Sequence, residues 1–164
     1  MIQLKRIDAG NVWDIVDLKV APEQEDFVAP NSDSIIEAYT TIGTGCTAFP
    51  FAVFNDETPV GFVMIGHNMT ALGEVCGEET PPSVQDNYLI WRLMIDAQYQ
   101  GQGYGRAATQ LALDFINTQP CGRAEYCVIS YEPENTVAQK LYASFGFVET
   151  DERDGSEIIA VLKL

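Results

Sequence analysis

A glycine-rich turn between a buried strand and a helix is the feature that most constrains this chain. Three glycines alternate with larger residues in the segment Gln98–Arg106. The preceding residues 88–95 form a nearly continuous apolar run, which is typical of a strand buried on both faces. Because glycine lacks a Cβ atom, the turn exposes successive backbone N–H groups at a helix N-terminus, where the macrodipole favours negative charge. The turn therefore predicts a phosphate or pyrophosphate site, with Arg106 as a nearby side-chain contact.

Two well-known nucleotide motifs do not fit this turn. A dinucleotide-binding turn needs the spacing GxGxxG and an acidic residue that closes the next strand. The spacing here is GxGxG, and the nearby acid, Glu125, begins the next predicted strand. A P-loop needs Gly-Lys-Ser/Thr, which is absent. A purely structural glycine turn stays open as the alternative.

A second motif lies on the helix predicted for residues 135–145. Its apolar stripe carries Tyr142, while Glu134 or Asn135 can cap its start. Gly146 is well placed as the left-handed residue that ends the helix. By itself, Tyr142 reads equally well as a core residue or as a functional hydroxyl group.

Hydrophobic periodicity and turn residues predict the order β-α-α-β-β-β-α-β-α-β-β within a single domain, residues 1–164. The expected strands are residues 2–7, 47–54, 60–69, 88–95, 125–130, 147–153 and 157–164. The expected helices are 11–20, 32–39, 103–118 and 135–145, and residues 70–87 are expected to form a loop. This order predicts a mixed α/β sheet with helices on both faces.

The net charge of −15 excludes several classes of partner. Nucleic acid needs a basic surface, and anionic membranes repel an acidic one. No apolar run approaches the roughly 20 residues that span a bilayer. Residues 1–6 lack the apolar region of a signal peptide, so a cytoplasmic location is expected. The four cysteines have no CxxC or CxxH spacing and there is one histidine, so no metal site is expected.

The acidic charge is unevenly distributed along the chain. No Lys or Arg occurs from residue 20 to residue 91, although this stretch contains many carboxylates. A surface of one sign raises the local concentration of cations. The alternative interpretation is that the charge serves solubility in the host.

The two motifs together resemble the GNAT superfamily of N-acetyltransferases. The pattern QxxGxG/A, followed about 35 residues later by NxxAxxLYxxFGF, is typical of that superfamily. The resemblance implies a mostly antiparallel central sheet, acetyl-CoA as the acetyl donor and a possible homodimer. It implies that the CoA pyrophosphate is held by Gln100, Gly101, Gln102, Gly103, Tyr104, Gly105 and Arg106.

The resemblance also implies further contacts with the donor. The backbone of Leu93, Met94 and Ile95, at a strand bulge, would bind the acetyl and pantetheine amides in the manner of an added strand. Asn135 would contact the cofactor arm. Tyr142 would protonate the departing CoA thiolate.

A finer resemblance lies before the second predicted helix. The pattern PxQxxFVAPN in Pro22–Asn31 and the segment Arg92–Asp96 are similar to bacterial spermine/spermidine and related diamine acetyltransferases. In those enzymes the first segment helps to form the acceptor side. The resemblance therefore implies a polycationic amine substrate that meets Glu23, Gln24, Glu25 and Asp26.

Direct attack of a neutral amine on the thioester needs no covalent enzyme intermediate. Holding an ammonium group of pKa about 10.4 neutral at pH 7 costs about 4.6 kcal/mol. A base is therefore needed, and Glu23, Glu25 and the acids of residues 70–86 are candidates. The ordinary pKa values of a thiol, about 8.5, and of tyrosine, about 10, allow Tyr142 to donate a proton to the thiolate.

Three alternatives stay open at this point. A cysteine nucleophile is disfavoured because no cysteine has a histidine neighbour in the sequence. A non-catalytic acyl-CoA sensor is disfavoured by the presence of Tyr142. An enzyme that acts on another amine, such as a protein N-terminus, an amino acid or an antibiotic, differs only in its acceptor.

Overall fold

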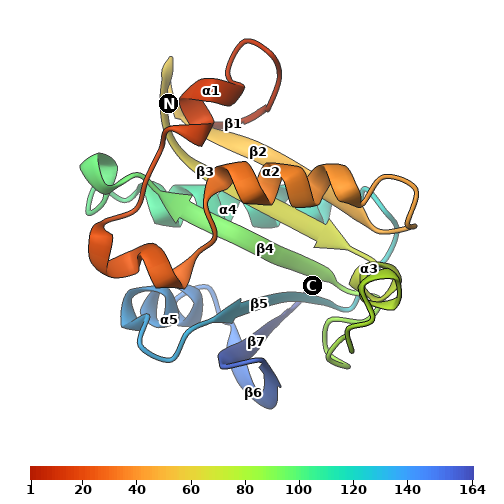
Figure 1. Cartoon of the computed structure of the whole chain (residues 1–164). Helices are drawn as coiled ribbons and strands as arrows, with labels where there is room; N and C mark the ends of the chain where they lie inside the picture. Colours follow the sequence, from red (N-terminus) through yellow and green to blue (C-terminus); the bar gives the residue numbers. More distant parts are fainter.

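A single seven-stranded sheet contains strands from both ends of the chain in the computed structural model, which describes residues 1–164. The strand order is β1-β2-β3-β4-β5-β7-β6 (Figure 1). All neighbouring strands are antiparallel except the parallel pair β4 and β5, which confirms the mixed, mostly antiparallel sheet. The strands are β1 Ile2–Arg6, β2 Thr47–Asn55, β3 Thr58–His67, β4 Tyr88–Ile95, β5 Tyr126–Tyr131, β6 Val148–Asp154 and β7 Glu157–Lys163.

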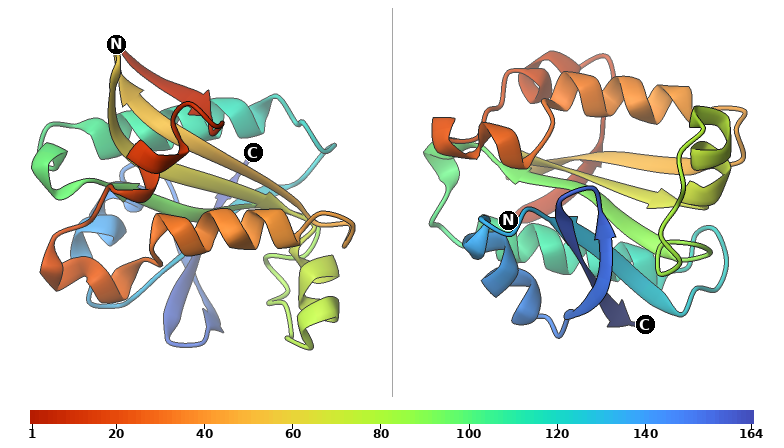
Figure 2. Two further views of the ribbon diagram at one scale, coloured as in Figure 1. Left: turned by 45° about the horizontal axis from the view of Figure 1, so that its top comes forward. Right: turned by 60° about the horizontal axis from the view of Figure 1, so that its bottom comes forward.

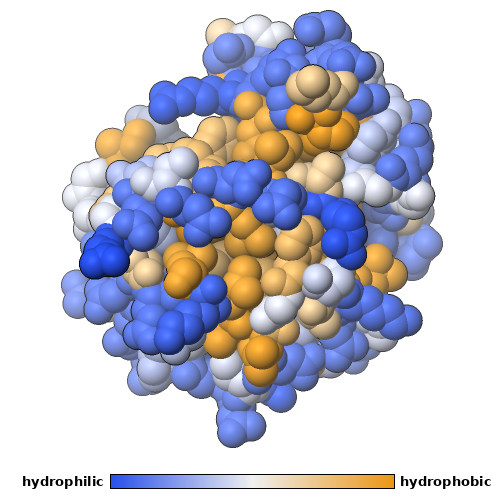
Figure 3. Space-filling view, turned by 180° about the vertical axis from the view of Figure 1, so that it is seen from behind, coloured by the Kyte–Doolittle hydropathy of each residue, from blue (hydrophilic) through white to orange (hydrophobic).

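Helices cover both faces of the sheet, as the sequence predicts. Figure 2 shows α2 along one face and α4 and α5 on the opposite face. Seen from behind, hydrophilic residues dominate the outline and hydrophobic residues gather nearer the centre (Figure 3). None of the helices combines the length and the apolar character that a membrane span requires. The helices are α1 Val12–Val16, α2 Asn31–Thr40, α3 Met69–Cys76, α4 Tyr104–Asn117 and α5 Thr136–Ala143, with 3₁₀ turns η1 Pro22–Phe27 and η2 Ala97–Tyr99.

The predicted loop over residues 70–87 is wrong in its first half, because α3 occupies Met69–Cys76. The residues that favour a loop in this segment of the sequence are Gly73, Gly77, Pro81 and Pro82. In the structure, a Cβ atom at Gly73 would lie 2.6 Å from Thr80 Oγ1 and 2.8 Å from the Glu78 carbonyl oxygen. The glycine therefore allows the following chain to fold back tightly against α3.

The first helix is also shorter than predicted. It ends at Val16 rather than near Val20, and the irregular acidic segment that follows contains the 3₁₀ turn η1. The second helix begins at Asn31, ahead of the predicted caps Ser32 and Asp33. Asn31 is buried, and its side-chain amide donates to the Ile15 carbonyl at 2.8 Å, which joins α2 to α1.

Strand β4 has the predicted bounds, but its middle is not buried on both faces. Its two ends are buried, whereas Trp91, Arg92 and Leu93 are half-buried. The strand bulges at Trp91, between the pairs Ile65–Ile90 and Met64–Arg92. It pairs with β5 only through Tyr88, Leu89 and Ile90. Beyond Ile90 the two strands separate, toward the left of Figure 1.

The close packing of β3 on the end of β4 gives a prediction about stability. A Cβ atom at Gly61 would clash with the Met94 carbonyl oxygen and would lie 2.7 Å from Ile95 Cδ1. We expect Gly61→Ala to reduce the free energy of unfolding by about 1–3 kcal/mol, the usual cost of overpacking. Denaturant unfolding of the unliganded protein measures this change.

Gly105→Ala is the matched control for that substitution. Its added methyl group would meet only Leu141 and Ile95, at 3.7 and 3.9 Å, and it lies in the first turn of α4. Because alanine favours a helix over glycine by up to about 1 kcal/mol, Gly105→Ala should not lower stability. Equal losses in both variants would contradict the close approach of β3 and β4.

Candidate active site

Two connected compartments fill the gap that β4 and β5 leave between them. The larger is a cavity of about 560 Å³, which we call the acceptor cavity, between the middle of β4, the end of β5 and the β6–β7 turn. The smaller is a groove of about 210 Å³, which we call the cofactor groove, between the end of β4, the glycine turn and α5. The residues that line both compartments, and therefore lie at the junction of the two spaces, are Phe27, Val28, Leu93, Asn135, Ala138 and Tyr142.

The glycine turn at the end of the groove has the backbone geometry that an anion site requires. Gly101 and Gly103 have φ values of +74° and +84°, in the left-handed region that favours glycine. The backbone N–H groups of residues 100–103 donate to no carbonyl of the chain, and the Ala107 N–H to Gly103 C=O bond, at 3.1 Å, begins α4. The N–H groups of the first helical turn lack partners as well. Successive free donors therefore lie at a helix N-terminus, where an anion is favoured.

A buried carboxylate fixes this turn to the rest of the site. Asp96 is 5% exposed and directly follows β4. Its two oxygens accept hydrogen bonds from Lys19 N, at 2.9 Å, and from Gln98 N, at 3.0 Å. One residue thus holds both the glycine turn and the segment that leads into η1.

The side-chain amide of Gln100 forms hydrogen bonds within the protein and is not free to bind a phosphate. Its amide donates to the Ile95 carbonyl at 2.9 Å and to Gln24 Oε1 at 2.7 Å. Gln24 also accepts from the Ala21 N–H at 3.2 Å. The two glutamines therefore join η1 to the end of β4, and Gln100 can meet an anion only through its backbone.

The side chains of Gln102, Tyr104 and Arg106 do not line the cofactor groove. Gln102 donates to the Gln98 carbonyl at 3.3 Å, and the Tyr104 hydroxyl accepts from Asn55 at 3.1 Å. The Arg106 guanidinium donates to Ser144 Oγ at 2.7 Å and lies 5.1 Å from the centre of the Phe145 ring. Arg106 thus belongs to the first turn of α4, and its guanidinium lies at the C-terminal end of α5.

Asn135 caps α5, as the sequence predicts. Its side-chain oxygen accepts from the Ala138 N–H at 3.1 Å. The amide nitrogen of Asn135 has no partner in the chain, and the residue lines both compartments. Gly146, beyond the helix, has the expected positive φ of +94°. The cap fixes Asn135 at the junction with a free donor.

Tyr142 is a buried residue that also reaches both compartments. It is 5% exposed, and its ring lies 5.8 Å from the Tyr131 ring and 5.9 Å from the Phe147 ring. Burial, and then the nearby Tyr131, Cys127 and Glu157, raise the pKa of Tyr142 above its usual value. The phenol is therefore neutral at pH 7. Proton transfer to a thiolate is more uphill than the ordinary tyrosine pKa indicates.

The four residues expected on the acceptor side are divided by the fold. Glu25 and Asp26 line the acceptor cavity, whereas Gln24 lines the cofactor groove. Glu23 lines neither compartment. The three acids are exposed and lie on η1, beside the opening of the cavity.

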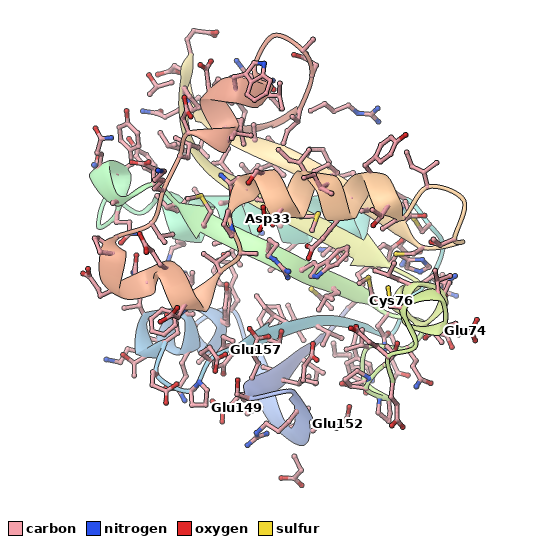
Figure 4. All side chains as sticks on the ribbon, in the orientation of Figure 1. Asp33, Glu74, Cys76, Glu149, Glu152 and Glu157 are labelled. Atoms are coloured by element: carbon pink, nitrogen blue, oxygen red, sulfur yellow. The ribbon has the colours of Figure 1, made fainter.

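Three carboxylates from the other side of the cavity were missed by the sequence analysis. Glu132, Asp154 and Glu157 line it from the end of β5 and the β6–β7 hairpin. Figure 4 shows Glu157 beside β5, with Glu149 and Glu152 farther along the hairpin. In the sequence this region reads only as a turn followed by a strand, and no local pattern points to a site.

Arg92 is the one cationic residue that lines the acceptor cavity. Its guanidinium forms an ion pair with Glu37 at 3.2 Å and donates to the Trp91 carbonyl at 2.8 Å. The side chain is 22% exposed, and its buried Nε has no partner. Glu37 thus neutralises the positive charge at this wall of the cavity.

No cysteine or histidine lines either compartment. Cys46 and Cys127 are buried, and burial raises the pKa of Cys46 to about 11. His67 pairs with Tyr88 at the opposite end of β4 from the glycine turn. No three His, Cys, Asp or Glu side chains are grouped closely enough to hold a metal ion. The arrangement leaves Tyr131, Tyr142 and the carboxylates as the groups that can exchange protons in the cavity.

The fold resembles those of solved acetyltransferases of low sequence identity. PaiA N-acetyltransferase from Thermoplasma acidophilum, in complex with coenzyme A, gives a TM-score of 0.66 at 14% identity, over 100% of this chain and 99% of that chain. Spermidine N-acetyltransferase from Vibrio cholerae, in complex with CoA and spermine, gives 0.67 at 16% identity, over 99% and 94%. Aminoglycoside acetyltransferase AAC(6')-Ib, in complex with coenzyme A, gives 0.71 at 12% identity, over 99% and 95%. Among curated proteins, no sequence relative matches the chain.

A family model shows the membership that the two sequence motifs predict. The model of the acetyltransferase (GNAT) family matches residues 12–147, which include β4, the glycine turn and α5. The match covers most of the chain and confirms acetyl-CoA as the donor. The chain belongs to the acetyltransferase (GNAT) family and is an acetyl-CoA-dependent N-acetyltransferase.

Proposed function

We propose that the acceptor is a di- or polyamine, such as spermidine or spermine, which takes the acetyl group by direct attack. The observation that carries this proposal is the charge of the acceptor cavity. Its walls contain five carboxylates and one guanidinium, and the guanidinium is already paired with Glu37. The carboxylates come from two sides of the opening and belong to Glu25, Asp26, Glu132, Asp154 and Glu157.

Such a cavity favours a ligand with several positive charges. An exposed ion pair contributes only about 0–1 kcal/mol, so no single carboxylate is decisive. Several carboxylates around one polycation raise its local concentration and its association rate, and salt weakens both effects. The fold similarities do not choose the acceptor, because the aminoglycoside enzyme gives a TM-score of 0.71 and the spermidine enzyme 0.67.

On the donor side, we propose that the pyrophosphate of acetyl-CoA binds the free N–H groups of the glycine turn. The pantetheine arm then lies in the cofactor groove along Leu93, Met94 and Ile95, where β4 has no partner strand on the side of β5. Asn135 offers its free amide to the arm, and Tyr142 offers its hydroxyl to the leaving sulfur. The thioester carbonyl then lies at the junction with the acceptor cavity.

We further propose that residues 1–164 act as one N-acetyltransferase domain in the cytoplasm, without nucleic acid or membrane as a partner. A homodimer through a sheet edge also stays a prediction. The edges of the sheet are β1 and β6, which each pair on one side only.

The anion site gives a prediction about ligand-induced stability. At a hundredfold excess over its Kd, acetyl-CoA should stabilise the wild type by about 2.7 kcal/mol. Gly103→Val should abolish most of this gain, because the side chain would project from the turn toward the phosphates. Thermal unfolding with and without acetyl-CoA measures the effect.

Gly43→Val is the matched control for that substitution. Gly43 has φ +87° against +84° for Gly103, and an added Cβ atom has no neighbour within 4 Å at either position. Both variants should therefore lose similar intrinsic stability, but only Gly103→Val should lose the shift with acetyl-CoA. A full shift in Gly103→Val would remove the turn from the donor site.

The hydroxyl of Tyr142 gives a prediction about turnover. Tyr142→Phe should lower kcat by roughly 10²-fold, the lower end of the range for one general-acid contact. Acetyl-CoA affinity should change little because the ring still packs. The control is Tyr131→Phe, which removes a 2.9 Å hydrogen bond to Glu149 beside the same ring and should alter kcat only a few-fold. If Tyr142→Phe keeps full turnover, Tyr142 is a core residue.

A thiol-release assay over a panel of amines tests the acceptor itself. kcat/KM should be higher for spermidine and spermine than for monoamines, and it should fall steeply with ionic strength, mainly through KM. A monoamine preference in the panel would refute the polyamine proposal.

A pair of variants tests where the polycation docks. Glu25→Gln combined with Asp26→Asn should flatten the salt dependence and leave acetyl-CoA binding unchanged. Glu23→Gln, one position earlier on η1 but outside the cavity, should behave like the wild type. If the double variant keeps the full salt dependence, docking occurs at the hairpin side of the cavity.

A further inference from the structure

We propose that Glu157 is the catalytic base that takes the proton from the acceptor ammonium, and that Ser130 orients its carboxylate. The proposal rests on acetyl transfer to an amine and does not require that the amine be a polyamine. It assigns the role for which the sequence offered only Glu23, Glu25 and the acids of residues 70–86.

The position of Glu157 places it between solvent and the reacting groups. It is the first residue of β7, directly after the turn that closes the β6–β7 hairpin. It lines the acceptor cavity, which Tyr142 also lines, and it lines a neighbouring cavity of about 310 Å³. That neighbouring cavity also contains Glu78 and Glu79, the acids of the earlier loop. A proton on Glu157 thus has a route outward past other carboxylates.

The contacts of Glu157 suit a base that is held in place but remains accessible. The Ser130 hydroxyl, on the neighbouring strand β5, donates a hydrogen bond to its carboxylate. Glu157 makes no ion pair with any Lys or Arg. Glu25 and Asp26 are exposed at the opening of the cavity, whereas Glu157 is half-buried. Glu132 is also half-buried and accepts a hydrogen bond from the Ser156 hydroxyl at 2.9 Å, but it does not line the neighbouring cavity. Glu157 is therefore oriented, free of a counter-ion and open to both cavities.

The electrostatic surroundings raise its proton affinity. Burial is the largest cause that raises the pKa of Glu157, and Asp154 and Glu132 raise it further. The Ser130 hydrogen bond and the Arg92 guanidinium act in the opposite direction. On the side of α5, Tyr142 is neutral at pH 7 and adds no charge. A raised carboxyl pKa lies closer to that of an ammonium group, so proton transfer between them is less unfavourable.

The proposed step balances in atoms and charge. The ammonium nitrogen gives one proton to the Glu157 carboxylate, and the neutral amine then forms a C–N bond to the thioester carbonyl carbon. As the C–S bond breaks, the Tyr142 hydroxyl donates its proton to the departing sulfur. A second proton from the nitrogen returns to the Tyr142 oxygen. Glu157 releases its proton to solvent, so the products are the amide, CoA thiol and one proton.

The pH dependence has a definite sign. Glu157 acts only when ionised, so kcat/KM should rise with pH through its raised pKa. The free energy of unfolding should depend on pH with the opposite sign. Because the folded-state pKa exceeds the unfolded one, the folded protein binds more protons between them, and stability falls as pH rises through that window. Glu157→Gln therefore should not lower the melting temperature at pH 7. If the role of Glu157 were to stabilise the fold, the same substitution would lower the melting temperature.

The test measures kcat, KM and the pH profile of Glu157→Gln with spermidine and with n-butylamine. We expect kcat to fall roughly 10²-fold with both amines. The melting temperature and the acetyl-CoA affinity should be retained. The fall of kcat/KM toward low pH, which we call the acid limb of the profile, should disappear. Asp154→Asn, which removes a neighbouring charge, should raise KM for spermidine and keep the acid limb.

Ser130→Ala provides the second, independent test. Removing the hydroxyl that orients Glu157 and lowers its pKa should move the acid limb to higher pH and lower kcat at high pH several-fold, less than Glu157→Gln does. If Glu157→Gln keeps wild-type kcat and its acid limb, the proposal is overturned while the acetyltransferase assignment stands. A wild-type enzyme that acetylates neither spermidine nor n-butylamine would overturn both the proposed amine acceptor and this role for Glu157. If the acid limb of the kcat/KM profile lies at the same pH in Ser130→Ala as in the wild type, Ser130 does not position Glu157.

Discussion

The short parallel pairing of β4 and β5 is the constraint on which the rest of the site depends. The two strands pair through three residues of each strand and then separate. Helix α5 and the β6–β7 hairpin approach this opening from one side, and η1 approaches it from the other. One edge of β4 beyond Ile90 therefore has no strand partner. The gap provides both the cofactor groove and the acceptor cavity, and it places Tyr142 where the two meet.

The charges of the two compartments suit opposite ligands. The glycine turn presents free N–H groups and Arg106 at the start of a 14-residue helix, so that end favours an anion. The acceptor cavity presents carboxylates from η1, β5 and the hairpin, so it favours a cation. The same carboxylates that attract an ammonium group also hold its proton more firmly. A half-buried carboxylate with a raised pKa, as we propose for Glu157, accepts that proton more readily than an exposed carboxylate does.

Local sequence patterns predicted the backbone features around the proposed donor site, but they did not point to the carboxylates that line the acceptor cavity from the hairpin. Strand β4, the glycine turn and the Asn135 cap are local features, because each depends on residues a few positions apart. The acceptor cavity depends on contacts that only the fold creates, such as that between Ser130 and Glu157, which are 27 residues apart. Helix α3 was missed for a related reason, since Gly73 is explained by its contact with Thr80 and Glu78 rather than by helix propensity.

Hydrogen exchange with and without saturating acetyl-CoA tests most directly whether the β4–β5 gap is the donor site. The unpaired edge of β4 and the free N–H groups of the turn should exchange readily in the unliganded protein, because exposed backbone donors open at little cost. Binding should slow exchange in peptides that cover residues 91–95 and 100–106 together, and leave the hairpin peptide 148–157 unchanged. Bound acetyl-CoA that protects neither 91–95 nor 100–106 would contradict this account.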